Sequence, residues 1–274
     1  MITSFPFRSS VLAFAAFAAL LTQSVRADVP AAPTPAKHFV TLKADPQGRL
    51  GIVTPLQGVH RIVCLGDSIT QFGDGPTGYV GLIRAYLTQV EAPLPIEVLN
   101  AGVSGNTSND ELGRLSRDVL DKRPDLVTVS VGVNDVWHGF DPAHPQGGGP
   151  GGVLLPVYQT NVEKRVTAMQ QQGIVVALLS PTVIGEDLND PRNAVVPGYV
   201  AALQDIARTH KCLYVDQLSS FETYLDLYRT TGHTDNLLTG DGVHVNDWGN
   251  RIMAARILSA LMSPAPKGVT LHAL

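Results

Sequence analysis

Residues 61–70 read RIVCLGDSIT, and residues 96–107 read IEVLNAGVSGNT. In each stretch a short apolar run stops abruptly, and glycines and small polar residues follow it. Between the two stretches, apolar residues recur every three or four positions from Tyr79 to Val90, which is the spacing of an amphipathic helix. A buried strand, a polar turn and a helix in this order form one unit of a parallel β-sheet.

The same unit recurs along the chain. Further strands are predicted at Leu126 to Val133, Ile174 to Leu179 and Cys212 to Val215. The helical faces that follow the second to fifth strands contain Leu112, Leu115 and Val119, then Val162, Val166 and Met169, then Tyr199, Val200, Leu203, Ile206 and Ala207, and finally Ile252, Met253, Ile257, Ala260 and Leu261. Ser108 and Glu111 predict a capping box for the first of these helices. Because continuous apolar strands are typical of sheets covered on both faces, the predicted class is α/β with a five-stranded parallel sheet.

The composition excludes several classes of protein. Of the 274 residues, 44% are hydrophobic and 16% charged, which gives the chain the apolar content that disordered proteins lack. A formal net charge of −4 offers no basic footprint, so we predict no nucleic-acid partner. Two cysteines are too few for a disulfide scaffold. Cys64 and Cys212 fall in apolar runs, so we expect buried thiols, and whether they pair stays open.

The first 27 residues are typical of a secretory signal peptide. Arg8 supplies a positive charge, Val11 to Leu21 is an uninterrupted apolar run, and Val25 and Ala27 suit the −3 and −1 positions of a cleavage site. The alternative is a membrane anchor, but a helix of 11 residues spans only about 16 Å, roughly half of the hydrocarbon core. We therefore predict a secreted or periplasmic protein with no stable membrane span.

The chain divides into four predicted segments: a signal peptide at 1–27, a linker and N-terminal extension at 28–59, one domain at 60–262 and a tail at 263–274. The linker begins with a stretch rich in proline and alanine. Removal of the signal peptide leaves 18 basic and 24 acidic residues and a net charge of −6.

Glycines and small polar residues cluster directly after the predicted strands, where parallel sheets bind their ligands. The clusters are Gly66 to Thr70, Asn100 to Thr107 and Gly132 to Asp135, and a fourth, Asp241 to His244, precedes the last helix. Each cluster taken alone is explained by an ordinary turn or helix cap.

Together, the clusters resemble the four sequence blocks of the GDSL/SGNH hydrolase family, and the resemblance extends over residues 60–262. It is carried by Ser68 in GDSIT, Gly105 in NAGVSGNT, Asn134 in GVND, and Asp241 and His244 in DGVH. The first block reads GDSIT where the family name has GDSL. The resemblance implies a three-layer α/β/α flavodoxin-like fold and the hydrolysis of carboxylic esters.

The chemistry of these side chains agrees with that resemblance. The Ser68 hydroxyl is a weak nucleophile unless a base takes its proton, and the His244 imidazole is the candidate base. Asp241, three residues earlier, can accept a hydrogen bond from Nδ1–H and fix the tautomer. The backbone N–H groups of Ser68 and Gly105 and the Asn134 amide are the expected oxyanion hole. A glycine at 105 lets the backbone approach without a Cβ.

Two further patterns bear on cofactors. His233 and Asp235 stand close in sequence to Asp241 and His244 and suggest a metal site, but the triad already uses the second pair, so we predict no metal. No nucleotide-binding glycine motif occurs, so we predict no cofactor.

Residues beside the blocks have simpler interpretations. Asp67 is expected to form a turn and Asp135 to stabilise a loop. Trp137 and His138, with the glycine-rich stretch 146–152 beyond them, either wall the substrate pocket or belong to a surface loop.

The sequence therefore predicts an exported serine hydrolase that acts through an acyl-enzyme on a small-molecule or carbohydrate ester, with short acyl groups on carbohydrate favoured. Three alternatives stay open: a lysophospholipase or thioesterase, a non-catalytic glycan-binding module, and an acyltransferase. The oligomeric state is not predicted.

Overall fold

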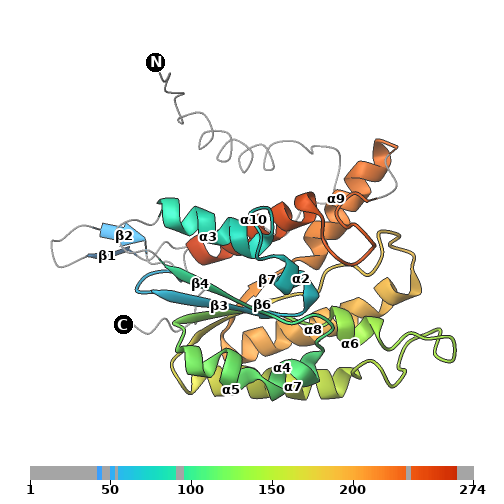
Figure 1. The fold of residues 1–274 in the computed structure, drawn as a ribbon, viewed down its shortest axis with the longest axis horizontal. Helices are drawn as coiled ribbons and strands as arrows, with labels where there is room; N and C mark the ends of the chain where they lie inside the picture. Colours follow the sequence, from blue (N-terminus) through green and yellow to red (C-terminus); the bar gives the residue numbers. More distant parts are fainter. Residues whose placement is uncertain (1–41, 45–49, 53–54, 91–95, 233–235, 264–274) are drawn as a thin grey trace. The chain divides into compact units, whose positions relative to one another are not determined.

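Figure 1 shows the computed structural model of the protein, which describes residues 42–44, 50–52, 55–90, 96–232 and 236–263. The predicted signal peptide, the end of the predicted tail, and His233 and Asp235 lie outside the described residues. Among the described residues, no helix has both the length and the apolar character that a membrane span needs.

The main sheet has five strands that all run parallel, which confirms the predicted fold class. They are β3 (Arg61–Gly66), β4 (Glu97–Gly102), β5 (Leu126–Ser130), β6 (Val175–Leu179) and β7 (Leu213–Val215). Their spatial order is β4-β3-β5-β6-β7, which is the flavodoxin-like order. In that order the chain reverses direction across the sheet between β3 and β5, so the carboxyl ends of these two strands are the expected place for a ligand.

Helices cover both faces of this sheet (Figure 1). One layer contains α3 (Tyr79–Val90), α9 (Leu218–Thr230) and α10 (Asp247–Met262); the other contains α4 (Ser108–Gly113), α5 (Leu115–Asp118), α7 (Leu155–Gln170) and α8 (Pro191–His210). Two helices of five residues, α2 (Ser68–Phe72) and α6 (Val133–Trp137), follow β3 and β5 directly. A short antiparallel pair, β1 (Leu42–Ala44) and β2 (Leu50–Ile52), lies within the predicted extension.

The strands are buried because both faces of the sheet are covered. Ile62 to Leu65 in β3 and all of β5 are inaccessible to solvent or nearly so. Cys64 and Cys212 are free, buried thiols, and burial raises the pKa of Cys64 to about 11. The prediction that these cysteines act as small buried residues is confirmed.

Several predicted boundaries are wrong for identifiable reasons. The third strand ends at Ser130 and not at Val133, because Gly132 adopts φ +126° and Val133 begins α6. The predicted capping box lies one residue earlier: the Asp110 carboxylate accepts hydrogen bonds from the Thr107 N–H (2.8 Å) and hydroxyl (2.7 Å). The helix expected through Leu112 to Val119 is divided into α4, α5 and a short 3-10 turn at Leu120–Lys122.

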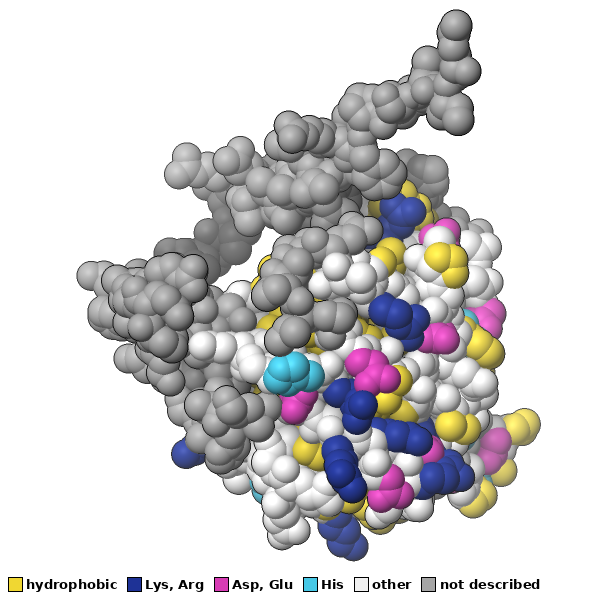
Figure 2. Space-filling model, turned by 60° about the vertical axis from the view of Figure 1, so that its left-hand side comes forward, with side chains coloured by type: hydrophobic (Ala, Val, Ile, Leu, Met, Phe, Trp, Pro, Cys, Tyr) yellow, Lys and Arg dark blue, Asp and Glu magenta, His cyan; other side chains and the backbone are white. Residues whose placement is uncertain are grey.

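The amino ends of the strands carry charged pairs. Asp125, just before β5, accepts hydrogen bonds from the backbone N–H groups of His60 (2.7 Å) and Arg61 (2.8 Å). Arg61 also pairs with Glu97 at 2.6 Å. Figure 2 shows a side of the molecule on which Lys and Arg side chains lie among Asp and Glu side chains, so that face carries charge of both signs.

Candidate active site

Ser68 begins α2 directly after β3. The Asp67 side chain caps this helix by accepting a hydrogen bond from Ile69 N at 2.9 Å, as expected for a turn former. Gly66 permits the tight turn, because a Cβ there would lie 1.9 Å from Thr70 Oγ1. Burial raises the pKa of Asp67 to about 6. Ser68 is therefore held at the carboxyl edge of the sheet by the geometry of the turn.

His244 and Asp241 come from the loop before α10. Within this loop, Asp241 Oδ1 accepts hydrogen bonds from the backbone N–H groups of Val243 (3.0 Å) and His244 (2.7 Å). Asp241 Oδ2 lies 2.6 Å from His244 Nδ1, and His244 Nε2 lies 2.9 Å from Ser68 Oγ. The structure thus brings all three predicted residues into one chain of hydrogen bonds.

The electrostatics of Asp241 favour its charged form. Partial burial would raise the pKa of this carboxyl, but the hydrogen bonds from the His244 side chain and backbone and from Val243 N–H outweigh burial and lower the pKa to about 2. A carboxylate that stays ionised fixes the proton of the imidazole on Nδ1 and leaves Nε2 free to accept one.

A carboxylate from the neighbouring loop anchors the segment before Asp241. Glu186 accepts hydrogen bonds from the backbone N–H groups of Leu237 (2.9 Å), Leu238 (2.8 Å) and Thr239 (2.7 Å), and also from the Thr239 hydroxyl (2.8 Å). Gly185 N–H donates to Gly242 O at 2.6 Å. These contacts tie the histidine loop to the loop that follows β6.

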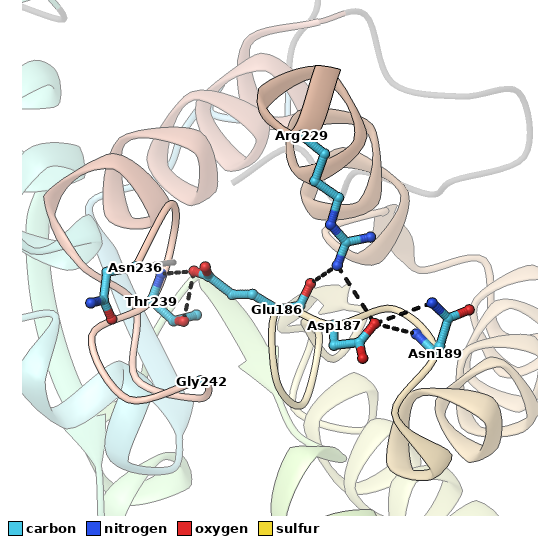
Figure 3. Close-up of a pocket in the computed structure, with 7 residues that line it drawn as sticks. All are labelled: Glu186, Asp187, Asn189, Arg229, Asn236, Thr239 and Gly242. Atoms are coloured by element: carbon cyan, nitrogen blue, oxygen red, sulfur yellow. Dashed lines mark hydrogen bonds and ion pairs between the residues drawn. The ribbon is translucent and has the colours of Figure 1, made fainter. Parts of the chain in front are cut away.

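A polar cavity of about 790 Å³ lies beside this anchor (Figure 3). It is lined by Glu186, Asp187, Asn189, Arg229, Asn236, Thr239 and Gly242. The Arg229 guanidinium reaches from α9 to Glu186 O and lies 3.8 Å from Asp187. Of the cavity's lining, Gly242 alone belongs to the Asp241–His244 turn, so the cavity adjoins this turn without being lined by Asp241 or His244.

The other two predicted residues are Gly105, on the loop after β4, and Asn134, in the first turn of α6 after β5. Gly105 adopts φ +78°, and no atom lies within 4 Å of the place a Cβ would take. Within the described protein the need for glycine comes from this positive φ, and the approach of the Gly105 backbone to a substrate without a Cβ stays a prediction. Asn134 Nδ2 donates to Asn106 O at 3.0 Å, which links α6 to the Gly105 loop.

Arg114 connects the strand ends beneath these loops. Its buried guanidinium donates to Gly66 O (2.8 Å) at the end of β3 and to Ala101 O (2.8 Å) near the end of β4. It also donates to Asn106 Oδ1 at 2.5 Å and pairs with Asp118 at 2.9 Å. One side chain thus ties the Gly105 loop to the ends of β3 and β4.

Further buried polar groups connect α4, α6 and α7. Asp135, which was expected to stabilise a loop, lies in α6 and accepts hydrogen bonds from Ser108 N at 3.0 and 3.1 Å, so it ties α6 to the start of α4. Glu111 and Arg165 form an ion pair with no exposed surface on either side chain. Burial raises the pKa of Glu111, although Arg165 opposes this shift.

The metal prediction concerns two residues outside the described chain, His233 and Asp235. Within the described ranges, no group of three His, Cys, Asp or Glu side chains converges as metal ligands would. Trp137 lines a cavity of about 290 Å³ with Phe140 and Pro145, and a role of Trp137 or His138 in substrate binding stays a prediction.

A profile of the GDSL-like lipase/acylhydrolase family matches residues 64–252 of the chain. The chain belongs to this family. It is 30% identical to an acetylxylan esterase of Geobacillus stearothermophilus over 73% of its own length and 92% of the relative's. The esterase fold is also seen in the crystal structure of an acetyl xylan esterase, AlAXEase, with 32% identity, a TM-score of 0.67 and coverage of 74% of this chain and all of the other.

The acetylxylan esterase Axe2 of Geobacillus stearothermophilus is similar as well, with 26% identity, a TM-score of 0.65 and coverage of 76% of this chain and 97% of Axe2. Its catalytic mutants replace a serine, an aspartate or a histidine by alanine, and the aspartate precedes the histidine by three residues. The family and these relatives establish the present protein as a carboxylic ester hydrolase with the SGNH fold.

The esterase also holds residues near the site that sequence reasoning missed. Phe72, at the end of α2, places its ring 5.3 Å from the His244 ring. The anchors Glu186 and Arg114 gave no local signal, because their partners are distant in the chain. A second pair, Asp141 and His144, repeats the spacing of Asp241 and His244, and this repeat was visible in the sequence.

Proposed function

We propose that this esterase removes acetyl groups from carbohydrate through a Ser68–His244–Asp241 triad. The observation that carries the proposal is the continuous hydrogen-bond chain from Asp241 Oδ2 through the imidazole to Ser68 Oγ, with distances of 2.6 and 2.9 Å. A serine hydroxyl within hydrogen-bond reach of a base that a carboxylate orients is the arrangement of an activated nucleophile.

In the proposed reaction, Ser68 Oγ attacks the ester carbonyl while His244 Nε2 takes the hydroxyl proton. The oxyanion accepts hydrogen bonds from the backbone N–H groups of Ser68 and Gly105 and from the Asn134 amide. Collapse of this intermediate breaks the bond to the alcohol, which receives the proton from His244. A water molecule then attacks the acyl-enzyme with His244 again as base, releasing acetate and restoring Ser68.

Two lines of support favour an acetyl ester of a sugar as the substrate. The relative that aligns over 92% of its own length is an acetylxylan esterase, and so are the solved structures described above. The His244 and Asp241 side chains are 31% and 54% exposed, and an accessible site suits a substrate presented on a bulky polymer.

The test compares the wild-type protein with Ser68→Ala on acetylated xylan, measured as acetate released. Loss of triad function lowers kcat by roughly 10⁴-fold or more, so the variant should show no turnover above background. Ser220→Ala, which changes a serine on α9, is the matched control and should keep full activity. A fluorophosphonate probe should label Ser68 in the control and nothing in Ser68→Ala; full turnover by Ser68→Ala would contradict the triad.

The substrate class is tested by a series of activated esters with acyl chains of increasing length. A steep preference for acetyl supports the proposal, and a preference for long chains or thioesters supports a lipid acyl hydrolase. Binding of glycan without any turnover would indicate a binding module, and faster transfer to an added alcohol than to water would indicate an acyltransferase.

We also propose export, on the sequence of residues 1–27 alone. Expression of the full chain should yield a protein that begins after Ala27 in the secreted or periplasmic fraction, as read by mass spectrometry of its amino terminus. An intact amino terminus retained in the cytoplasm would contradict this proposal.

A further inference from the structure

Phe72 is a large apolar side chain that the protein leaves in water beside the triad. With 62% of its surface accessible, it is the most exposed large hydrophobic residue in the described part of the chain. Its ring centre lies 5.3 Å from that of His244, with the two planes inclined at 56°. An aromatic ring kept exposed next to reacting groups is a candidate binding surface, because contact with a ligand recovers the apolar area that folding left in water.

The backbone that carries Phe72 is fixed from several sides. Thr70 O accepts a hydrogen bond from Asn100 Nδ2 at 2.6 Å, and Gln71 Oε1 accepts one from Ser104 N at 2.7 Å. Gly102 allows α2 to approach β4 closely, since a Cβ there would lie 2.2 Å from Gln71 N. The ring of Phe72 is therefore presented from a rigid turn, four residues after Ser68 and so on the same side of α2.

The contact with His244 identifies which part of a substrate meets this ring. In the proposed reaction His244 returns its proton to the leaving alcohol, so the alcohol oxygen must lie next to Nε2. Two of the proposed oxyanion donors, Gly105 and Asn134, follow β4 and β5 in the chain, whereas His244 comes from the loop before α10. A ring packed against the imidazole thus borders the alcohol half of the ester, and not the oxyanion.

We propose that Phe72 is the platform on which the sugar ring of the leaving alcohol packs, which deepens the proposed function and rests on it. A pyranose ring has a flat C–H face that fits an aromatic face, while its hydroxyl groups at the rim remain in water. Phenylalanine has no polar tip, so it recognises the flat face of the ring without selecting one hydroxyl pattern.

The experiment compares two acetyl esters in the full-length protein. Acetylated xylo-oligosaccharide has a pyranose leaving group, and ethyl acetate has a leaving group with no ring to stack. Phe72→Ala should lower kcat/KM for the oligosaccharide about fivefold to tenfold, mainly through KM, and change ethyl acetate hydrolysis less than about twofold. Phe72→Tyr keeps the aromatic face and should retain wild-type values on both.

Leu227→Ala, which removes an exposed apolar side chain from α9, is the matched control and should change neither rate. A second measurement uses unacetylated xylo-oligosaccharide as a competitive inhibitor of ethyl acetate hydrolysis. Its inhibition constant should rise about fivefold to tenfold in Phe72→Ala and stay unchanged in Phe72→Tyr and Leu227→Ala.

The outcomes separate this inference from the function on which it rests. If Phe72→Ala slows both esters equally, the ring positions His244 and the platform is refuted. An unchanged inhibition constant in Phe72→Ala refutes it as well, while acetyl ester hydrolysis by the wild type still stands. Absence of turnover on both esters in the wild type would remove the proposed function and this inference together.

Discussion

Two turns of this esterase have the same internal hydrogen bonds but different neighbours. Asp241 and His244 form one of them, and Asp141 and His144 form the other. In both, the aspartate accepts a hydrogen bond from the backbone N–H of the histidine three residues later, at 2.7 and 2.9 Å respectively. In both, the carboxylate also contacts the imidazole Nδ1, at 2.6 and 2.9 Å. The carboxyl pKa is lowered in both turns.

The difference lies at the far side of the imidazole. His244 Nε2 meets Ser68 Oγ, which is 176 residues away in sequence, whereas His144 Nε2 has no hydrogen-bond partner among the described residues. The Asp241 turn is also anchored to the loop of Glu186. An Asp-x-x-His turn is therefore a local structure that can form at several places in a chain. Only the tertiary fold brings a serine to the imidazole and so makes such a turn a candidate for catalysis.

The largest difference between the two turns is expected when each histidine is removed. His244→Ala deletes the proposed base and should lower kcat by roughly 10⁴- to 10⁶-fold. His144→Ala removes the matched residue and should change kcat less than about twofold. Initial rates of acetate release from acetylated xylan measure both, with circular dichroism to confirm folding. Comparable losses in the two variants would show that the second turn takes part in the reaction.

Neutralising each aspartate sharpens the same contrast. Asp241→Asn keeps the shape but no longer holds the imidazole in the correct tautomer, so kcat should fall by about 10³- to 10⁴-fold. Asp141→Asn should leave kcat within about twofold of the wild type. The same acetate assay measures both, and a fluorophosphonate labelling rate gives an independent measure of Ser68 reactivity. Normal labelling of Asp241→Asn would contradict the role given to Asp241.

The second difference between the turns is that Glu186 anchors the segment before Asp241, and substitution of Glu186 tests it. Glu186→Gln removes the charge that holds the Leu237–Thr239 segment, and hydrogen bonds to charged groups contribute about 1.5–3 kcal/mol each. We expect kcat to fall about tenfold through displacement of the turn. Asp187→Asn changes the neighbouring exposed carboxylate and should leave kcat unaltered. An equal effect of the two changes would point to the charge of the cavity and not to the anchor.

The smallest expected effect is on acid stability. Because both carboxyl groups have a pKa below the value of about 3.9 in unfolded chains, their contribution is present above that pH and is lost as the pH falls toward the folded pKa, about 2 for Asp241. Both groups are well exposed, so solvent screens the effect. Urea unfolding at pH 6 and pH 2.5 should show a slightly smaller acid-induced loss in either Asn variant. A larger loss would reverse the assigned direction.

Local sequence patterns predicted the strands and the order of the blocks, because both depend on neighbouring residues. They failed where two overlapping pairs of residues fitted the same motif. Thr107 with Asp110 and Ser108 with Glu111 both fit a capping box, and the structure selects the first because Glu111 is buried against Arg165. α9 was missed although its apolar residues Leu218, Phe221 and Leu225 follow helical spacing.

The residues around the proposed triad were harder to predict, for a physical reason. Phe72 has no local pattern that marks it, since an exposed aromatic residue becomes informative only once His244 lies beside it. Arg114 was hidden in the same way, because its acceptors belong to two strands and a loop. The five proposed site residues could be predicted from the sequence because they lie in four short sequence blocks.

The guanidinium of Arg114 fixes groups near the site before any substrate binds. It joins Gly66 O, Ala101 O and Asn106 Oδ1, and Asn106 O in turn holds the Asn134 amide. The groups that we propose as oxyanion donors are thus linked by hydrogen bonds when the chain folds, and their conformational entropy is lost at that stage. In the proposed reaction each turnover then begins with the donors already in place, which keeps the reorganisation of the surroundings small as negative charge develops on the substrate.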